Sequence, residues 1–135
     1  ADAGGFCEVD QKTLRHPRYS NIFSLGDACS SPNAKTAAAI RKQIVVVAEN
    51  ILAEKEDRAL TALYDGYGAC PLTVENGKVV LAEFGFGGKL LPTLPLKPTA
   101  PSKIAWLLKA KLFPWLYWNG MLKGREWLAR PSKTH

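Results

Sequence analysis

The sequence predicts an α+β fold, in which a long helix, an antiparallel β-hairpin and a helical C-terminal region follow one another along the chain. Three observations lead to this class. Apolar residues recur with a helical period in residues 40–51, an Asn-Gly pair separates two extended stretches at residues 76–77, and a Leu- and Trp-rich segment follows residue 102. The 135 residues allow one core. The chain begins without Met or a signal-peptide pattern, so we expect a fragment of a longer protein.

The composition excludes two broad classes. With 47% hydrophobic and 22% charged residues, the sequence is that of a folding chain and not of a disordered tail. Pro114 and Gly120 interrupt the most apolar region, which leaves it shorter than the roughly 20 apolar residues that span a bilayer. We therefore expect no transmembrane helix.

The N-terminal part predicts a strand followed by a helix. Residues 21–25 (Asn-Ile-Phe-Ser-Leu) are typical of a buried strand that ends in a tight turn at Gly26 and Asp27. Residues 30–33 supply helix-start chemistry, and a helix is predicted over residues 34–55. Its apolar face is expected to comprise Ile40, Ile44, Val47 and Ile51. A polar linker is expected near residues 55–63.

The Asn-Gly pair at residues 76–77 predicts a two-residue hairpin loop between residues 70–75 and 78–84. That loop predicts the opposing pairs Glu75–Lys78, Val74–Val79, Leu72–Leu81 and Cys70–Glu83. The same register places one set of side chains on the face of Cys70: Leu72, Val74, Val79 and Leu81. The Gly- and Pro-rich residues 85–101 are expected to form an irregular connection.

Two further helices are predicted near the C-terminus. Ser102 is expected to cap a helix that runs to about residue 113, with one face formed by Ile104, Leu108 and Leu112. Pro114 is expected to open a second helix, with one face formed by Trp115, Trp118 and Leu122.

Charge is concentrated in this last part of the chain. Residues 85–135 carry nine basic side chains and one acidic one, and they contain all four tryptophans (Trp106, Trp115, Trp118 and Trp127). Basic residues interleaved with Trp suit an anionic membrane surface. Nucleic acid fits less well, because Leu and Ile, and not polar residues, separate the rings. An ordinary apolar core with solvated lysines remains the alternative.

The cysteines by themselves predict no metal site. Cys7, Cys29 and Cys70 are widely spaced and form no Cys-x-x-Cys pair, and the chain has two histidines. Scattered cysteines of this kind are typical of small buried apolar side chains.

A possible ligand loop precedes the first helix. Gly26 and Asp27 follow the predicted strand and lie shortly before the Ala-rich helix start. This order brings a carboxylate and helix N-terminal N–H groups to one place, which suits a polyhydroxyl ligand beside an anion.

The octapeptide at residues 21–28 (Asn-Ile-Phe-Ser-Leu-Gly-Asp-Ala) resembles the second flavin-binding motif of the two-dinucleotide flavoproteins, the pyridine nucleotide–disulfide oxidoreductase superfamily. The pentapeptide at residues 35–39 (Lys-Thr-Ala-Ala-Ala) is similar to the helix start that faces the flavin pyrimidine ring. The resemblance implies FAD as cofactor, with Asp27 on the ribityl chain. The cofactor-binding residues that it implies are Gly26, Asp27, Lys35, Thr36, Ala37, Ala38 and Lys109.

Later motifs indicate the subfamily. Residues 64–72, 80–84, 108–110 and 113–119 resemble, in this order, the C-terminal part of mitochondrial-like sulfide:quinone oxidoreductases. The chain lacks the family's Gly-x-Gly-x-x-Gly phosphate loop, its second dinucleotide domain and its other redox cysteine, so we expect the C-terminal third of such an enzyme. The resemblance implies three parts, namely the tail of an α/β FAD-binding domain (residues 1–58), a hairpin with the redox cysteine and a linker (59–101), and basic aromatic membrane helices (102–135).

The resemblance implies that Cys70 is one of two cysteines in a sulfur-bridged redox centre, which sulfide attacks before electrons pass through FAD to a quinone. The hairpin register adds Glu83 as a carboxylate beside that sulfur. Lys35 and Lys109 would place positive charge near the flavin, although Lys109 alternatively extends from a membrane helix toward the headgroups. The residues expected at the quinone entry or the membrane are Phe113, Trp115, Tyr117 and Trp118.

The implied partners are sulfide, a sulfur acceptor, a quinone and a membrane surface, without nucleic acid and with a homo-oligomer left open. The expected location is peripheral, on a bacterial cytoplasmic membrane or the mitochondrial inner membrane. A type II NADH:quinone oxidoreductase is one alternative, but it does not explain Cys70 in its Ala-Cys-Pro-Leu context. A non-catalytic membrane-binding module is another. We expect the isolated chain to be inactive, because half a cofactor site binds weakly.

Overall fold

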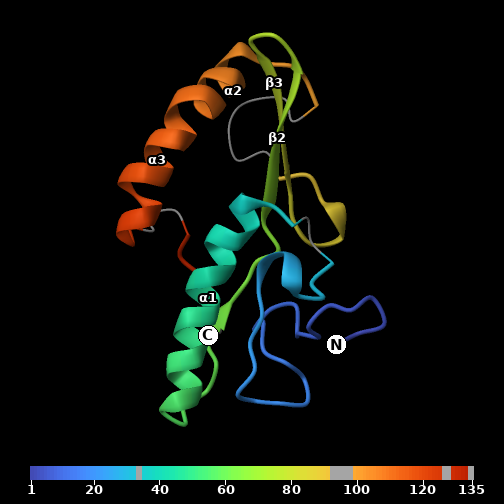
Figure 1. The fold of residues 1–135 in the computed structure, drawn as a ribbon, viewed down its shortest axis with the longest axis vertical. Helices are drawn as coiled ribbons and strands as arrows, with labels where there is room; N and C mark the ends of the chain where they lie inside the picture. The colour runs from blue at the N-terminus through green and yellow to red at the C-terminus, as the bar shows by residue number, and fades with distance from the viewer. Residues whose placement is uncertain (33–34, 92–98, 126–128, 134–135) are drawn as a thin grey trace.

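A computed structural model describes residues 1–32, 35–91, 99–125 and 129–133. It confirms an α+β architecture with helices and two separate two-stranded antiparallel sheets among these residues. The molecule is elongated (Figure 1). The N-terminal segment lies against helix α1 (Ala37–Lys55) in one half, and the hairpin lies beside helices α2 (Lys103–Leu107) and α3 (Phe113–Asn119) in the other.

The N-terminal segment is mostly irregular. The strand predicted at residues 21–25 is wrong, because this stretch pairs through a single antiparallel bridge between Arg15 and Phe23 and leaves Ile22 exposed. One bridge cannot supply the continuous ladder of hydrogen bonds that a strand needs. The chain then forms a 3-10 turn at Gly26–Ala28, with Gly26 at φ +64°.

Helix α1 spans Ala37–Lys55 and begins where Thr36 Oγ1 accepts a hydrogen bond of 3.3 Å from Ala39 N–H. The helix therefore starts later than the predicted residue 34. Of the predicted helix-start residues 30–33, Asn33 lies outside the described part of the chain, as does residue 34. A Thr side chain satisfies an N-terminal amide that would otherwise lack an acceptor, which explains this start.

The buried face of α1 differs from the predicted apolar stripe. Ile44 and Ile51 are 50% and 46% exposed. The residues that α1 buries are Ala39, Gln43, Val46, Val47, Asn50 and Ala53. Polar side chains lie inside because the neighbouring loops need hydrogen-bond partners. Asn50 Nδ2 donates to the carbonyls of Thr13 and Ala62, at 2.9 Å each, and Gln43 Oε1 accepts from Gly26 N–H at 2.8 Å.

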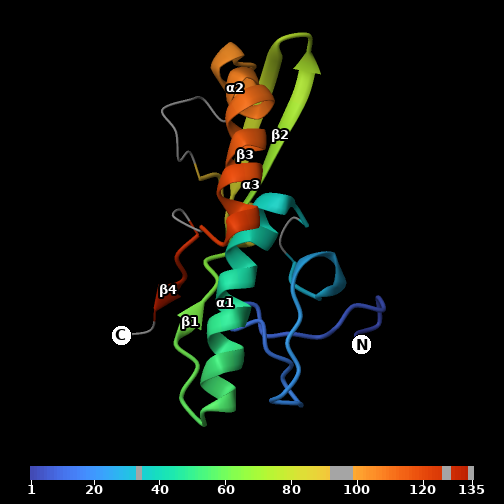
Figure 2. The same ribbon diagram turned by 60° about the vertical axis from the view of Figure 1, so that its left-hand side comes forward.

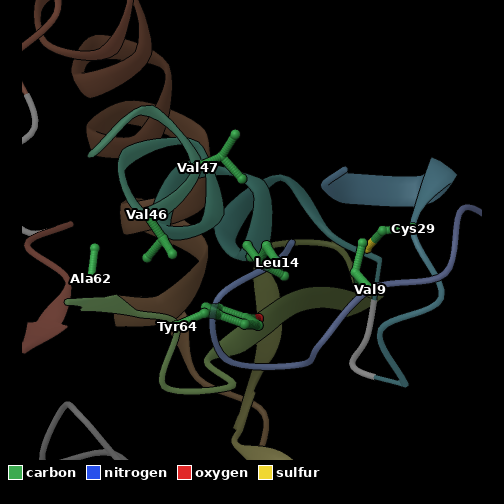
Figure 3. Close-up of a cluster of buried hydrophobic side chains, with 8 residues drawn as sticks. Val9, Leu14, Cys29, Val46, Val47, Ala62 and Tyr64 are labelled. Carbon is green, nitrogen blue, oxygen red and sulfur yellow. The ribbon is translucent and has the colours of Figure 1, made fainter. Parts of the chain in front are cut away.

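The first core lies between α1 and the segments beside it (Figure 3). Its buried members are Val9, Leu14, Cys29, Ala39, Val46, Val47, Ala62 and Tyr64. The predicted polar linker near residues 55–63 ends in strand β1 (Ala62–Leu63), which pairs antiparallel with β4 (Ser132–Lys133). Ala62 is buried there, and Asn50 satisfies both its N–H and its carbonyl.

The hairpin is confirmed, with β2 at Gly68–Glu75, β3 at Lys78–Phe84 and Gly77 at φ +73° in the turn. Its predicted register is wrong beyond the pair Glu75–Lys78. A bulge leaves Val74 without a partner, so Thr73 opposes Val79. The remaining pairs are Leu72–Val80, Pro71–Leu81, Cys70–Ala82, Ala69–Glu83 and Gly68–Phe84.

One extra residue in a strand moves every side chain on the far side of the bulge from the turn to the other face of the hairpin. Cys70 therefore shares its face with Leu72, Val80 and Ala82, while Val79, Leu81 and Glu83 face the interior. The bulge brings Thr73, and not Val74, onto the face covered by the C-terminal helices. There Lys109 Nζ donates to Thr73 Oγ1 at 2.7 Å and to the Pro71 carbonyl at 2.8 Å.

The C-terminal helices run beside this hairpin in both views (Figures 1 and 2). Helix α2 (Lys103–Leu107) begins at the predicted cap, where Ser102 Oγ accepts from Ala105 N–H at 3.3 Å. A π-helical turn (Leu108–Leu112) and helix α3 (Phe113–Asn119) follow without a break. Pro114 lies in the first turn of α3, as predicted, but no break separates this helix from the preceding turn. The wider turn ahead of the proline accommodates its missing N–H and its ring.

Short 3-10 turns complete the described structure at Phe86–Gly88 and Met121–Lys123. Part of the predicted irregular connection, residues 92–98, lies outside the described residues, and so does Trp127. Among the helices that are described, each is too short or too polar to cross a bilayer.

Candidate functional site

The predicted cofactor residues at the start of α1 lie together. The backbone N–H of Gly26 is bound by Gln43, while the side chain of Asp27 is exposed beside it. Lys35 Nζ donates to the carbonyls of Asp27 at 2.8 Å and Cys29 at 2.6 Å. This ammonium group therefore holds the Gly26–Ala28 turn against the segment that leads into α1.

The N-terminus of α1 adds amide donors to this place. Thr36 caps the helix through the N–H of Ala39. Ala37 and Ala38 are in the first turn, where backbone N–H groups have no acceptor within the helix and carry partial positive charge. A carboxylate, an ammonium group and helix N-terminal amides are thus brought to one place.

Lys109, the remaining predicted cofactor residue, lies elsewhere. Its Nζ is held by the Pro71 carbonyl and by Thr73 Oγ1, so it joins the π-helical turn to strand β2. The structure does not bring Lys109 to the loop of Asp27. Its observed contacts are those of a side chain that fixes the helices to the hairpin.

Cys70 is a half-buried free thiol on β2, opposite Ala82. Glu83, which the sequence placed across from it, opposes Ala69 and points to the other face of the hairpin. The premise for a carboxylate beside the Cys70 sulfur is therefore wrong, because the Val74 bulge shifts the register. Glu83 is 5% exposed, and its Oε1 accepts a hydrogen bond of 2.6 Å from the Tyr67 hydroxyl.

Sequence reasoning missed a partly buried polar cluster at the base of the hairpin. Burial raises the pKa of Tyr67 far above its ordinary value, and the hydrogen bond to Glu83 adds to this. Lys42 pairs with Asp65, and its Nζ lies 4.7 Å from the centroid of the Tyr67 ring. The spacing of these residues follows neither a helix nor a strand period, so no sequence pattern indicated them.

Tyr64 lies between this cluster and the first core. Its hydroxyl donates to the Tyr67 carbonyl at 2.6 Å, and burial raises the pKa of Tyr64 to about 12. The edge of its ring meets Phe86, with 5.8 Å between the ring centroids. The two tyrosines therefore connect the core beside α1 to the hairpin that carries Cys70.

The four residues predicted at the quinone or membrane divide into two groups. Trp115, Tyr117 and Trp118 are exposed, with Trp118 at 63%. Phe113 packs against the second core cluster, which consists of Val79, Leu81 and Ala105. Exposed lysines at positions 103, 111 and 123 accompany the three exposed rings. This part of the chain therefore combines a basic and an aromatic surface.

The curated relatives of this chain include three that are each named mitochondrial sulfide:quinone oxidoreductase. The relative from Dictyostelium discoideum is 43% identical over 136 residues, covering 98% of this chain and 30% of the relative. That from Mus musculus is 37% identical over 92% of this chain and 28% of its own length. That from Schizosaccharomyces pombe is 36% identical over 94% of this chain and 29% of its own length.

A chain in the cryo-EM structure of the Tetrahymena thermophila mitochondrial ATP synthase, an F1Fo composite tetramer, also has a similar fold. The TM-score is 0.71 with 29% sequence identity, over 93% of this chain and 29% of that one. No protein-family model matches the sequence. The resemblance to sulfide:quinone oxidoreductases is therefore confirmed, and the chain corresponds to a segment that spans about 30% of the length of these curated relatives.

Proposed function

We propose that the chain is the C-terminal segment of an FAD-dependent enzyme that oxidises sulfide to sulfane sulfur and passes the electrons to a membrane quinone. The observation that carries this proposal is the 43% identity to a sulfide:quinone oxidoreductase over 98% of the chain. The match includes Cys70, whose thiol is free and half-buried on β2.

The residues at the start of α1 fit a flavin. The exposed carboxylate of Asp27 can accept hydrogen bonds from ribityl hydroxyls, and the amides of Ala37 and Ala38 suit the electron-rich pyrimidine edge. Lys35 keeps the loop in place through two backbone carbonyls. FAD, when bound, supplies the acceptor for the two electrons that sulfide gives up. We assign residues 1–58 to the tail of the flavin domain on this basis.

Cys70 is proposed to share a sulfur bridge with a cysteine from the rest of the longer protein. Sulfide attacks one sulfur of that bridge, the S–S bond breaks, one cysteine keeps a persulfide and the other leaves as a thiolate. The half-buried position of Cys70 suits both roles, since the sulfur is accessible yet held on a paired strand. We assign residues 59–101 to this redox hairpin, with Glu83 on its opposite face.

The surface formed by Trp115, Tyr117 and Trp118 is proposed to dock on the mitochondrial inner membrane, where a quinone dissolves. Indole and phenol rings favour the headgroup level of a bilayer, and lysines attract anionic lipid. Three exposed rings and three exposed lysines within this region support this assignment of residues 102–135. Phe113 is left out of the docking surface, because it packs against Val79 and Leu81.

The experiment that tests this function uses the longer protein. In stopped-flow measurements, Cys70→Ser should abolish flavin reduction by sulfide and leave FAD bound, because a serine oxygen cannot form the sulfur bridge. Cys7→Ser is the matched control and should retain flavin reduction. An active Cys70→Ser enzyme would overturn the assignment. The 135-residue chain alone should lose FAD on gel filtration, because it would supply only part of the flavin contacts.

A second candidate is a non-catalytic module within a membrane complex. The similar chain in the ATP synthase structure favours it, since that chain belongs to the structure of a mitochondrial F1Fo ATP synthase. The same stopped-flow measurement separates the two. A longer protein that co-purifies with a membrane complex but shows no sulfide-dependent flavin reduction, even with Cys70 intact, would support the module.

A further inference from the structure

The backbones of Cys7 and Cys29 lie side by side in the N-terminal segment. They are partners in a parallel β-bridge, in which Cys7 N–H donates to the Ala28 carbonyl and Ser30 N–H donates to the Cys7 carbonyl, each at 2.8 Å. Partners on neighbouring strands lie about 4.8 Å apart and project to the same face of the pair. Disulfides need Cα atoms about 4.4–6.8 Å apart, so the backbone spacing is suitable.

Other contacts hold the segment around Cys7 and the segment around Cys29 in this register. Val9 N–H donates to Ser30 Oγ at 3.0 Å. Lys35 Nζ donates to the Cys29 carbonyl and also lies 4.0 Å from the centroid of the Phe6 ring, which precedes Cys7 in the chain. The pairing therefore rests on these three interactions together with the two backbone hydrogen bonds of the bridge, and not on one backbone contact.

The two thiols differ in accessibility. Cys29 is 1% exposed and lies beside Val9 in the first core, where its Sγ–H is 3.2 Å from the Gly26 carbonyl (Figure 3). Cys7 is half-buried and packs against the same core. Both are free thiols. A reagent from solvent can thus reach Cys7 before Cys29.

We propose that Cys7 and Cys29 form a redox-active dithiol that closes to an intramolecular disulfide by exchange with a low-molecular-weight disulfide such as oxidised glutathione. Cys7, as thiolate, attacks one sulfur of the reagent and releases one glutathione thiolate. Cys29, as thiolate, then attacks the Cys7 sulfur and releases the second glutathione. Two electrons pass from the cysteines to the reagent, and their two protons end on the glutathione thiols.

The disulfide would connect the N-terminal segment to the loop of Asp27. Cys29 lies two residues after Asp27, and the carbonyls of both residues are held by Lys35. Oxidation therefore ties Cys7 covalently to the loop that lies beside the N-terminus of α1. This inference concerns a pair of cysteines other than Cys70 and does not depend on the proposed function.

The test uses the 135-residue chain carrying Cys70→Ser, so that Cys7 and Cys29 are its remaining cysteines. The folded protein is equilibrated in buffers with increasing oxidised over reduced glutathione, quenched in acid, alkylated and analysed by mass spectrometry. We expect the loss of two hydrogens and a linked peptide pair containing Cys7 and Cys29. Two thiols that stay alkylatable at the most oxidising ratio, or a persistent glutathione adduct, would overturn the proposal.

Single-cysteine variants check the order of attack. With Cys70 also replaced, Cys29→Ala should trap a glutathione on Cys7, while Cys7→Ser should leave Cys29 unmodified in the folded state. As the matched control, a chain that keeps Cys29 and Cys70 but carries Cys7→Ser should form no intramolecular disulfide. Circular dichroism establishes that each variant is folded. Modification of Cys29 at the rate of Cys7, or a Cys29–Cys70 disulfide in the control, would contradict the inference.

Discussion

The Tyr67 hydroxyl donates a hydrogen bond of 2.6 Å to Glu83 Oε1, which joins the turn before β2 to the buried end of β3. Glu83 faces the interior because it alternates along β3 with the buried residues Val79 and Leu81, while the Val74 bulge places Cys70 on the opposite face. A carboxylate that is 5% exposed needs such partners, since burying charge without them is costly. The bond therefore belongs to the structure of the hairpin base and not to the environment of the Cys70 sulfur.

Tyr67→Phe should destabilise the chain by about 1–3 kcal/mol, the usual effect of removing a partner from a buried polar group. Urea unfolding followed by Trp fluorescence measures the change. Tyr117→Phe is the control, because Tyr117 is exposed and its loss should change the free energy of unfolding by less than about 0.5 kcal/mol. Equal unfolding midpoints for the two variants would show that the Tyr67–Glu83 bond does not stabilise the fold.

Tyr64 should make stability fall at high pH. Burial raises its pKa from 10.0 to about 12 in the folded state, so the unfolded chain loses this proton first. The contribution of Tyr64 is complete below pH 10 and is lost as pH rises toward 12. The slope from this one group approaches about 1.4 kcal/mol per pH unit within that window.

Urea unfolding at pH values from neutral to alkaline checks this, with Tyr64→Phe compared against the exposed-tyrosine variant Tyr19→Phe. Tyr64→Phe should make the alkaline decline less steep by the share that Tyr64 contributes, and Tyr19→Phe should not change it. If the unsubstituted chain, Tyr64→Phe and Tyr19→Phe all lose stability with the same pH slope, Tyr64 does not titrate as described.

The observed hairpin register can be distinguished from the simple two-residue register by engineered cysteines. Cys70 opposes Ala82, so Ala82→Cys should form a disulfide with Cys70 on mild oxidation. Glu83→Cys should not, because residue 83 opposes Ala69 and projects to the other face. Peptide mapping of the non-reduced protein decides between them. A Cys70 linkage in the Glu83→Cys variant, and none in Ala82→Cys, would restore the bulge-free register.

Lys109 should matter for stability through its two contacts with β2. Lys109→Met removes both contacts from Nζ, to the Pro71 carbonyl and to Thr73 Oγ1, and should cost about 1–3 kcal/mol. Lys111→Met is the matched control, since Lys111 is exposed on the same helical run and its loss should cost below about 0.5 kcal/mol. Chemical denaturation measures both. Similar losses in the two variants would mean that the Lys109 contacts do not hold the helices to the hairpin.

The exposed aromatic surface should bind anionic vesicles. Trp fluorescence should shift to the blue when vesicles containing phosphatidylserine are added, and added salt should weaken the binding. Trp118→Ala should reduce affinity roughly tenfold, consistent with the loss of about 1.5 kcal/mol of ring burial. Tyr19→Ala, an exposed ring in the N-terminal segment, should leave affinity unchanged. Equal binding to neutral and anionic vesicles would reject the role of the lysines.

Local chemistry in the sequence was sufficient to predict several features. Asn76 and Gly77 predicted the hairpin because glycine adopts the positive φ of +73° that the turn requires. Ser102 predicted a helix start because its hydroxyl reaches the N–H three residues later. The flavin loop around Asp27 and Lys35, indicated by a motif that is contiguous in the chain, stays a prediction. Each of these features depends on neighbours within a few residues.

Tertiary structure decided what depends on distant partners. Gln43 and Asn50 determine the buried face of α1. Their side chains form hydrogen bonds with the backbone of Gly26 and of Ala62, and Ile44 is left exposed. Lys109 donates a hydrogen bond to Thr73, and the bulge at Val74 sets the hairpin register. The cluster around Tyr67 and the Cys7–Cys29 bridge likewise join residues that are distant in the sequence. Their members meet only after the chain has folded, because no local period brings them together.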